Sequence, residues 1–151
     1  HLGFVDITQS WQKEELIPFE RLISSGLADA IMTGHLYNKN FDSHYPATLS
    51  SSTLQLLLRK ELQFDGVIIS DDMQMKAITS RFGLEEACCR AIKAGIDLII
   101  IGNNLVHDPF VFRKLAKSLR NAVLQGALTE ERIEDAWTRV QKIKQLPGKT
   151  I

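Results

Sequence analysis

The chain has 151 residues, of which 44% are hydrophobic and 24% charged, and its formal net charge at pH 7 is +0. This length allows one domain that buries about two thirds of the surface of the unfolded chain. The acidic and basic side chains are interspersed and no apolar run approaches roughly 20 residues, so neither a nucleic-acid footprint nor a polybasic membrane anchor nor a membrane span is expected.

Hydrophobic periodicity predicts a helix followed by a strand in the first part of the chain. The helix is expected over residues 11–23, with Pro18 starting a turn or a kink within it. The strand is expected at 29–33, and the polar stretch 36–48 is expected to be a long loop. A second helix is predicted to start after an N-cap at Ser50.

The rest of the chain continues the same alternation. Strands alternating with helices predict a parallel sheet joined by right-handed crossovers. The expected elements are a strand at 67–70, a connecting stretch to Gly83, a helix from 84 closed by Gly95, a strand at 98–101, a helix capped by Asp108 that runs to about 126, and a last helix that begins near Thr129.

Two adjacent carboxylates, Asp71 and Asp72, follow the strand at 67–70 directly. In α/β folds the chemistry gathers at the carboxyl ends of the strands, so Asp71 is a candidate nucleophile or base. Aspartate is also a preferred N-cap residue, and the spacing alone explains Asp71 equally well as the cap of the next helix. Both interpretations stay open on the residues alone.

The segment Phe64–Met73, together with Met75, resembles the nucleophile strand of glycoside hydrolase family 3 in its β-N-acetylglucosaminidase branch. The resemblance implies that Asp71, directly after Ser70, is a covalent nucleophile. Asp72 favours this branch over the related β-glucosidases, which often carry tryptophan at that place. Asp72 itself is expected to cap the following turn, with no catalytic step.

The stretch His1–Gly3 resembles the end of the family's Asp-Ser-His-x-Gly loop, which implies that His1 is the general acid/base. The segment Met32–His35 is similar to the family's Met-Thr-Ala-His, and this similarity places His35 among the substrate-binding residues. Met73 is expected to be a substrate-binding residue as well. Without the resemblance, His1 is a terminal residue, His35 a hydrogen-bonded structural group and Met73 core filling.

The resemblance implies a retaining glycoside hydrolase that releases terminal β-N-acetylhexosamine, chiefly N-acetylglucosamine, from cell-wall or related glycans. In such an enzyme the nucleophile attacks the anomeric carbon while the acid protonates the departing oxygen, and water then hydrolyses the glycosyl-enzyme. A carbohydrate substrate is expected, and no cofactor, metal, nucleic acid or membrane partner.

Residues 1–151 are expected to form a single partial domain, the C-terminal portion of a (β/α)8 TIM barrel with about three parallel strands. This chain alone is then expected to be inactive and to need the missing N-terminal part of the barrel or a second copy of itself. The sequence does not specify the cellular compartment of the protein, and the cytoplasm is slightly favoured. The alternatives are a non-catalytic α/β module and a β-glucosidase-type member of the same family.

Other motifs fail. The run 148–150 (Gly-Lys-Thr) lacks the preceding glycine of a P-loop. A metal site built on Asp71, Asp72 and a histidine has no supporting ligand spacing. The adjacent Cys88 and Cys89 fit no zinc or redox motif and are expected to be small thiols buried on a helix.

Overall fold

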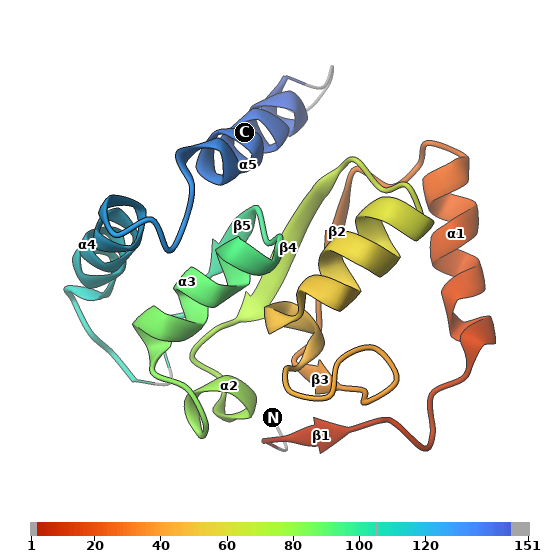
Figure 1. Ribbon diagram of the computed structural model, residues 1–151, viewed down its shortest axis with the longest axis horizontal. Coiled ribbons are helices and arrows are strands. Elements are labelled where there is room, and N and C mark those ends of the chain that lie inside the picture. Colours follow the sequence, from red (N-terminus) through yellow and green to blue (C-terminus); the bar gives the residue numbers. More distant parts are fainter. Residues whose placement is uncertain (1–2, 105, 146–151) are drawn as a thin grey trace.

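The computed structural model describes residues 3–104 and 106–145. A three-stranded parallel sheet of order β2-β4-β5 lies at the centre, and a separate parallel pair joins β1 to β3 (Figure 1). The elements are β1 (Val5–Asp6), η1 (Lys13–Leu16), α1 (Ile17–Ser24), β2 (Ala30–Met32), β3 (Leu36–Tyr37), η2 (Ala47–Leu49), η3 (Ser52–Glu61), β4 (Val67–Asp72), α2 (Lys76–Thr79), α3 (Leu84–Ala94), β5 (Leu98–Ile100), α4 (Val111–Leu124) and α5 (Glu130–Lys144).

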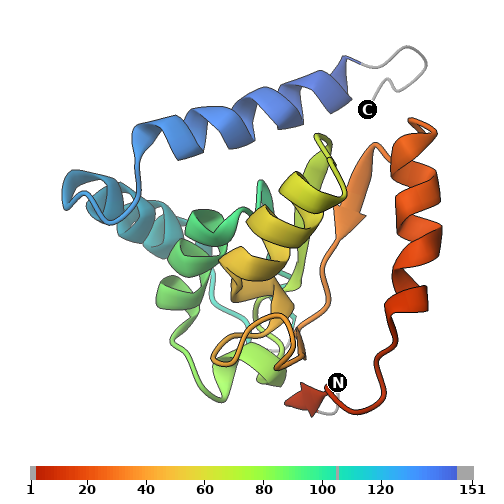
Figure 2. The same ribbon diagram turned by 45° about the vertical axis from the view of Figure 1, so that its right-hand side comes forward.

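The two ends of the sheet carry different elements. The β1–β3 pair and α2 lie together at the end where β4 finishes, and α5 runs across the opposite end (Figures 1 and 2). Because the strands are parallel, their carboxyl ends all meet at the end that carries α2. That end holds the candidate nucleophile.

The hydrophobic core lies between the sheet and the helices that follow β3 and β4. Ile68 of β4 is fully buried there, in the same cluster as Leu54 of η3 and Ala91 of α3. Complete burial of such side chains contributes about 1.5–3 kcal/mol each, and this burial fixes η3 and α3 on the sheet. The other buried apolar residues of this core are Leu49, Leu58, Phe64, Met73, Ile78, Ala87, Cys88, Ala94, Ile96, Val111 and Leu115.

Both edges of the central sheet are flanked by apolar grooves. One groove, of about 420 Å³, lies along β2 and α1 and exposes Leu27 and Met32 by 72% and 60%. The other, of about 320 Å³, lies along β5 and α5 and includes Leu98 and Trp137, which are 39% and 62% exposed. Strand edges with exposed apolar side chains are surfaces on which further strands pack.

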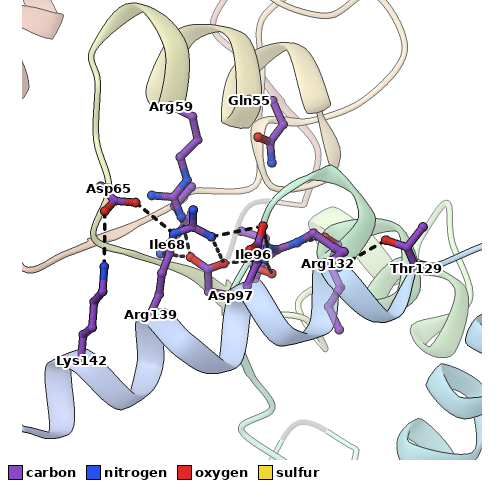
Figure 3. Close-up of polar contacts among 12 residues, drawn as sticks. Gln55, Arg59, Asp65, Ile68, Ile96, Asp97, Thr129, Arg132, Arg139 and Lys142 are labelled. Atoms are coloured by element: carbon purple, nitrogen blue, oxygen red, sulfur yellow. Dashed lines mark hydrogen bonds and ion pairs between the residues drawn. The ribbon is translucent and has the colours of Figure 1, made fainter.

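A buried ion cluster ties α5 and η3 to the amino ends of the strands (Figure 3). The side chain of Asp97, which is 0% exposed, accepts hydrogen bonds from Arg59 Nη2 at 2.6 Å and from the Ile68 amide at 3.0 Å. Its other oxygen accepts from Arg132 Nη2 and lies 3.8 Å from Arg139 Nη1. We call Arg59, Asp97, Arg132 and Arg139 the Asp97 cluster. Burial lowers the pKa of Arg59, an effect that the charge of Asp97 opposes.

Several predicted elements are confirmed. The Ser50 hydroxyl accepts the Thr53 amide at 3.1 Å as an N-cap of the helical segment that includes η3, and Thr129 caps α5 by accepting the Arg132 amide at 3.2 Å. Gly95 ends α3 with a φ of +132°, which favours glycine.

Other predictions were wrong in detail. The stretch 36–48 is not all loop, because Leu36 and Tyr37 form β3. Pro18 does not interrupt a helix but stands in the first turn of α1, where its missing N–H leaves no bond unmade. Asp108 caps a turn by accepting the Phe110 amide, and α4 begins only at Val111. Among the described helices, none has the length and apolar character needed to cross a membrane.

Candidate active site

Asp71 is the fifth residue of β4, the middle strand of the central sheet, and lies at its carboxyl end. Its side chain is partly exposed, and Oδ1 accepts the main-chain amide of Asp72 at 2.7 Å. Neither carboxylate caps a helix, because α2 begins at Lys76 and has Met75 as its N-cap residue. The N-cap interpretation of Asp71 is therefore wrong, and a partly exposed carboxylate at a strand end stays available for chemistry.

An irregularity in the pairing of β4 with β5 lies beside this carboxylate. Ile69 pairs with Leu98 and Asp72 pairs with Ile100, so three steps along β4 correspond to two steps along β5. Ser70, which is 0% exposed, compensates for the irregular pairing because its hydroxyl accepts the Ile100 amide at 3.0 Å. Bulges of this kind are frequent beside active sites, where they change the direction in which a side chain points.

Asp72 holds the turn after β4 and the loop after β5. Its Oδ1 accepts the Gln74 amide at 3.0 Å and the Gly102 amide at 3.1 Å, so the prediction that Asp72 caps the following turn is confirmed. A Cβ at position 102 would lie 2.6 Å from Asp72 Oδ2, so only glycine allows this approach. The sequence placed Gly102 directly after a predicted strand, and that was the signal for its role.

His35 is 5% exposed and joins the ends of β2 and β4. Its Nε2 lies 3.0 Å from the carbonyl oxygen of Asp72, and its Nδ1 lies 2.9 Å from Thr48 Oγ1. A carbonyl only accepts, so Nε2 donates to Asp72, and for the same reason the Thr48 hydroxyl donates to the Gly34 carbonyl at 3.2 Å. The Thr48 oxygen in turn lies 2.9 Å from Thr33 Oγ1. This buried chain of hydrogen bonds fixes the backbone beside Asp71.

Gln74 connects the loop after β4 to the loop after β5, a role that the sequence did not indicate. Its Oε1 accepts the Asn103 amide at 2.6 Å and its Nε2 donates to the Val106 carbonyl at 3.1 Å. Asn103 has a φ of +51° and bonds to both backbone groups of Asp108. Gln74 therefore ties the turn after β4 to Asn103 and Val106, which follow β5.

The structure brings three of the four predicted site residues into one region. Asp71 is partly exposed, His35 is buried, and Met73 is 0% exposed within the core. Sugar contact by His35 and Met73 stays a prediction, and their burial favours support of the strand end. His1 lies outside the described residues. In the described part of the chain no group of three or more His, Cys, Asp or Glu side chains is arranged to hold a metal ion.

The family of this chain follows from its similarity to known proteins. A family model for the glycosyl hydrolase family 3 N-terminal domain matches residues 1–143. The chain belongs to glycosyl hydrolase family 3. The predicted family is thus confirmed over nearly all of the sequence.

Two curated relatives of family 3 are named β-hexosaminidase. That of Glaesserella parasuis is 42% identical over 89 residues, covering 59% of this chain and 26% of the relative. That of Tolumonas auensis is 36% identical over 107 residues, covering 69% of this chain and 32% of the relative. The chain therefore spans about a quarter to a third of the length of these relatives.

Solved family 3 structures share the fold. A β-N-acetylglucosaminidase from a Paenibacillus species is 32% identical, with a TM-score of 0.81 over 98% of this chain and 28% of that one. CbsA from Thermotoga neapolitana is 30% identical, with a TM-score of 0.81 over 93% of this chain and 32% of that one. The predicted fold class, an α/β chain that forms the C-terminal portion of a (β/α)8 barrel, is confirmed.

Proposed function

We propose that this chain supplies the nucleophile of a retaining family 3 glycosidase that releases terminal β-N-acetylhexosamine, chiefly N-acetylglucosamine. The observation that carries the proposal is the placement of Asp71 at the carboxyl end of the central strand, partly exposed and oriented by a main-chain amide. The relatives named β-hexosaminidase and β-N-acetylglucosaminidase support this choice of sugar. Cell-wall or related glycans are the proposed natural source.

In the proposed mechanism Asp71 acts as an ionised carboxylate. The Asp72 amide holds Oδ1 at 2.7 Å, which leaves Oδ2 to attack the anomeric carbon. The C–O bond to the aglycone breaks as the new ester bond forms, and the general acid delivers a proton to the departing oxygen. Water then attacks the glycosyl-enzyme while the same residue, now a base, takes the proton of that water.

We propose His1 as the acid/base, from its place in a segment that resembles the family's histidine loop. The described residues that follow it support this role. Val5 and Asp6 form β1, which pairs with Leu36 and Tyr37 of β3 directly after His35. The chain that leads away from His1 is thus attached at the same end of the sheet as Asp71.

His35 is proposed to position the strand end, in addition to its predicted place among the substrate-binding residues. Its Nε2 donates to the Asp72 carbonyl, one residue beyond the nucleophile, and both ring nitrogens have partners. A main-chain group fixed on that side keeps the Asp71 carboxylate in one orientation. Positioning of this kind lowers the barrier to attack because the reacting atoms need no further ordering.

Residues 1–151 are proposed to be one part of a longer catalytic domain. The matched segments make up only 26% and 32% of the two curated relatives, and each edge of the sheet carries an apolar groove on which further β/α units would pack. The partners proposed for these grooves are the other strands of the barrel or, for the chain by itself, a second copy.

The decisive experiment traps the glycosyl-enzyme in the full-length protein. A fluorinated N-acetylglucosaminide analogue that forms long-lived glycosyl-enzymes should label Asp71, as located by peptide mass spectrometry. Asp71→Asn should abolish hydrolysis of an aryl N-acetyl-β-glucosaminide and leave the thermal transition unchanged. The matched control is Asp65→Asn, because that side chain is 73% exposed and precedes β4 at its other end. Label on another carboxylate, or full activity in Asp71→Asn, would remove Asp71 from this role.

The same assay separates the sugar classes. An aryl β-glucoside replaces the N-acetyl sugar in a parallel reaction, with all other conditions unchanged. A protein that prefers the glucoside belongs to the β-glucosidase type, and a protein that hydrolyses neither sugar is a non-catalytic module.

A further inference from the structure

A cavity of about 330 Å³ lies between η3, α3 and α5, at the end of the sheet that carries the Asp97 cluster. Its lining includes four cationic side chains, from Arg59, Lys93, Arg132 and Arg139, and one carboxylate, from Asp135. None of its described lining residues takes part in the apolar grooves at the sheet edges. The cavity is therefore distinct from the surfaces proposed for further β/α units.

Two guanidinium groups in this lining keep unused hydrogen-bond donors. Arg132 bonds through Nε and Nη2 to Asp97 and to two main-chain carbonyls, whereas its Nη1 lies 3.9 Å from Asp135 Oδ2. Arg139 Nη1 lies 3.9 Å from the same oxygen. Within the described part of the chain, the single hydrogen bond of the Arg139 guanidinium joins Nε to Asp65 at 3.4 Å. Because a direct N–H···O bond measures about 2.7–3.2 Å, both Nη1 groups converge on one oxyanion without bonding to it.

Positive charge is in excess in this lining and is partly shielded from water. The side chains of the two arginines are 13% and 21% exposed, so salt screens their charges only in part. The carboxylates nearest to them are the buried Asp97 and the exposed Asp135 and Asp65, and Asp65 also pairs with Lys142. An exposed carboxylate holds its partners weakly, because water competes for both charges. An anion that enters the cavity can therefore form the bonds that Asp135 leaves unmade.

A second cavity adjoins the first and carries a further cation. Its volume is about 290 Å³, and it shares Lys93 and Leu128 with the lining of the first cavity. Arg90 lines it and lies over the Tyr45 ring, with the guanidinium carbon 4.1 Å from the ring centroid. The Arg90 Nε is buried and has no hydrogen-bond partner among the described residues, a rare state for a buried donor. The cationic lining thus continues beyond the first cavity, where the body of a small ligand has room.

We propose that the first cavity binds a phosphate group, carried by inorganic phosphate or by a phosphate monoester, through Arg132 and Arg139. A planar guanidinium group matches two phosphate oxygens at once. A phosphate monoester carries a charge of about −1.5 to −2 at pH 7 and three accepting oxygens, so it offsets the excess charge better than a carboxylate does. Lys93, which is exposed, supplies a further cation at the same cavity. The site lies at the opposite end of the sheet from Asp71, so the inference does not depend on the proposed function.

The test is thermal unfolding of the full-length protein in increasing potassium phosphate, with potassium chloride holding the ionic strength constant. Phosphate that binds the folded state should raise the unfolding midpoint along a saturating curve, from which the dissociation constant follows. Glycerol phosphate in a parallel series distinguishes the two sources of the group. Tighter binding of glycerol phosphate than of inorganic phosphate identifies a monoester as the ligand, and equal or weaker binding identifies the free ion.

Three variants tie this binding to the cavity. Lys93→Met should raise the dissociation constant about twofold to fivefold, the range of one exposed ion pair, and should unfold like the wild type without phosphate. Asp135→Asn should lower the dissociation constant by a similar factor, because it removes the carboxylate that competes for the two arginines. The matched control is Lys117→Met, at an exposed lysine of α4 outside both cavities, which should leave the dissociation constant unchanged.

A rise in the midpoint that does not saturate, or no rise above that in potassium chloride alone, would overturn the site. Saturable binding that Lys93→Met and Asp135→Asn both leave unchanged would also overturn it, because the phosphate would then bind elsewhere. Phosphate also stabilises folded proteins through its exclusion from their surface, but that effect is the same in every variant. Labelling of Asp71 and hydrolysis of the aryl glycoside do not depend on these results, so failure of this site is distinguishable from failure of the proposed function.

Discussion

Replacing Asp97 by asparagine is expected to cost the folded protein about 3–5 kcal/mol, the usual result of breaking a buried ion pair from one side. The Asp97 side chain is 0% exposed, and its partners Arg59 and Arg132 are only 12% and 13% exposed. An asparagine keeps one acceptor oxygen. If that oxygen serves Arg59 and the Ile68 amide, the new amide group points its hydrogens at Arg132 and leaves that guanidinium buried without a counter-charge.

The assay is thermal or urea unfolding of the full-length protein. A loss of this size is a large fraction of the roughly 5–15 kcal/mol that stabilises an ordinary protein. The matched control is Asp135→Asn. Asp135 also faces Arg132 and Arg139, but at 3.9 Å and with its side chain 58% exposed, so its loss should cost about 0–1 kcal/mol. If Asp97→Asn and Asp135→Asn unfold alike, the Asp97 cluster does not hold α5 and η3 to the sheet.

Three further predictions concern the acid, the thiols and the isolated chain. In the full-length protein His1→Ala should reduce hydrolysis of glycosides with poor leaving groups far more than that of activated aryl glycosides, and equal losses in steady-state assays would exclude His1 as the acid. Burial raises the pKa of Cys88 to about 12, so that thiol stays protonated at pH 8. Because the thiolate is the reactive form, iodoacetamide should modify Cys89 well before Cys88, and equal rates of modification measured by mass spectrometry would contradict this. The 151-residue chain by itself should be catalytically inactive and should self-associate through the grooves at its sheet edges. If analytical ultracentrifugation shows a monomer, and that monomer hydrolyses an aryl N-acetylglucosaminide, the partial-barrel interpretation is refuted.

Local chemistry made part of this architecture predictable. The apolar run before Asp71 indicated a buried strand, and β4 begins at Val67 as expected. Gly95 and Thr129 mark helix ends by their own conformational and hydrogen-bonding preferences, without help from distant residues. Such signals act within a few positions of the chain, so the sequence shows them directly.

Features that depend on distant partners were not predictable in this way. The strand at Leu36–Tyr37 has two residues, too few to show a period, and it forms because β1 pairs with it from about 30 positions earlier. The cluster around Asp97 joins Arg59 and Arg132, which are 38 and 35 residues away. A charge inside the apolar run before β5 was the available signal, because aspartate is almost never fully buried unless it is paired.

The bond between the Asp71 carboxylate and the amide of the next residue affects how this site can evolve. That donor belongs to the main chain, so point substitutions other than proline at position 72 leave it in place. Side chains of the surrounding loops are then free to change while this support for the Asp71 carboxylate persists. A lineage built on such a frame can vary its loops without first rebuilding the orientation of this strand-end carboxylate.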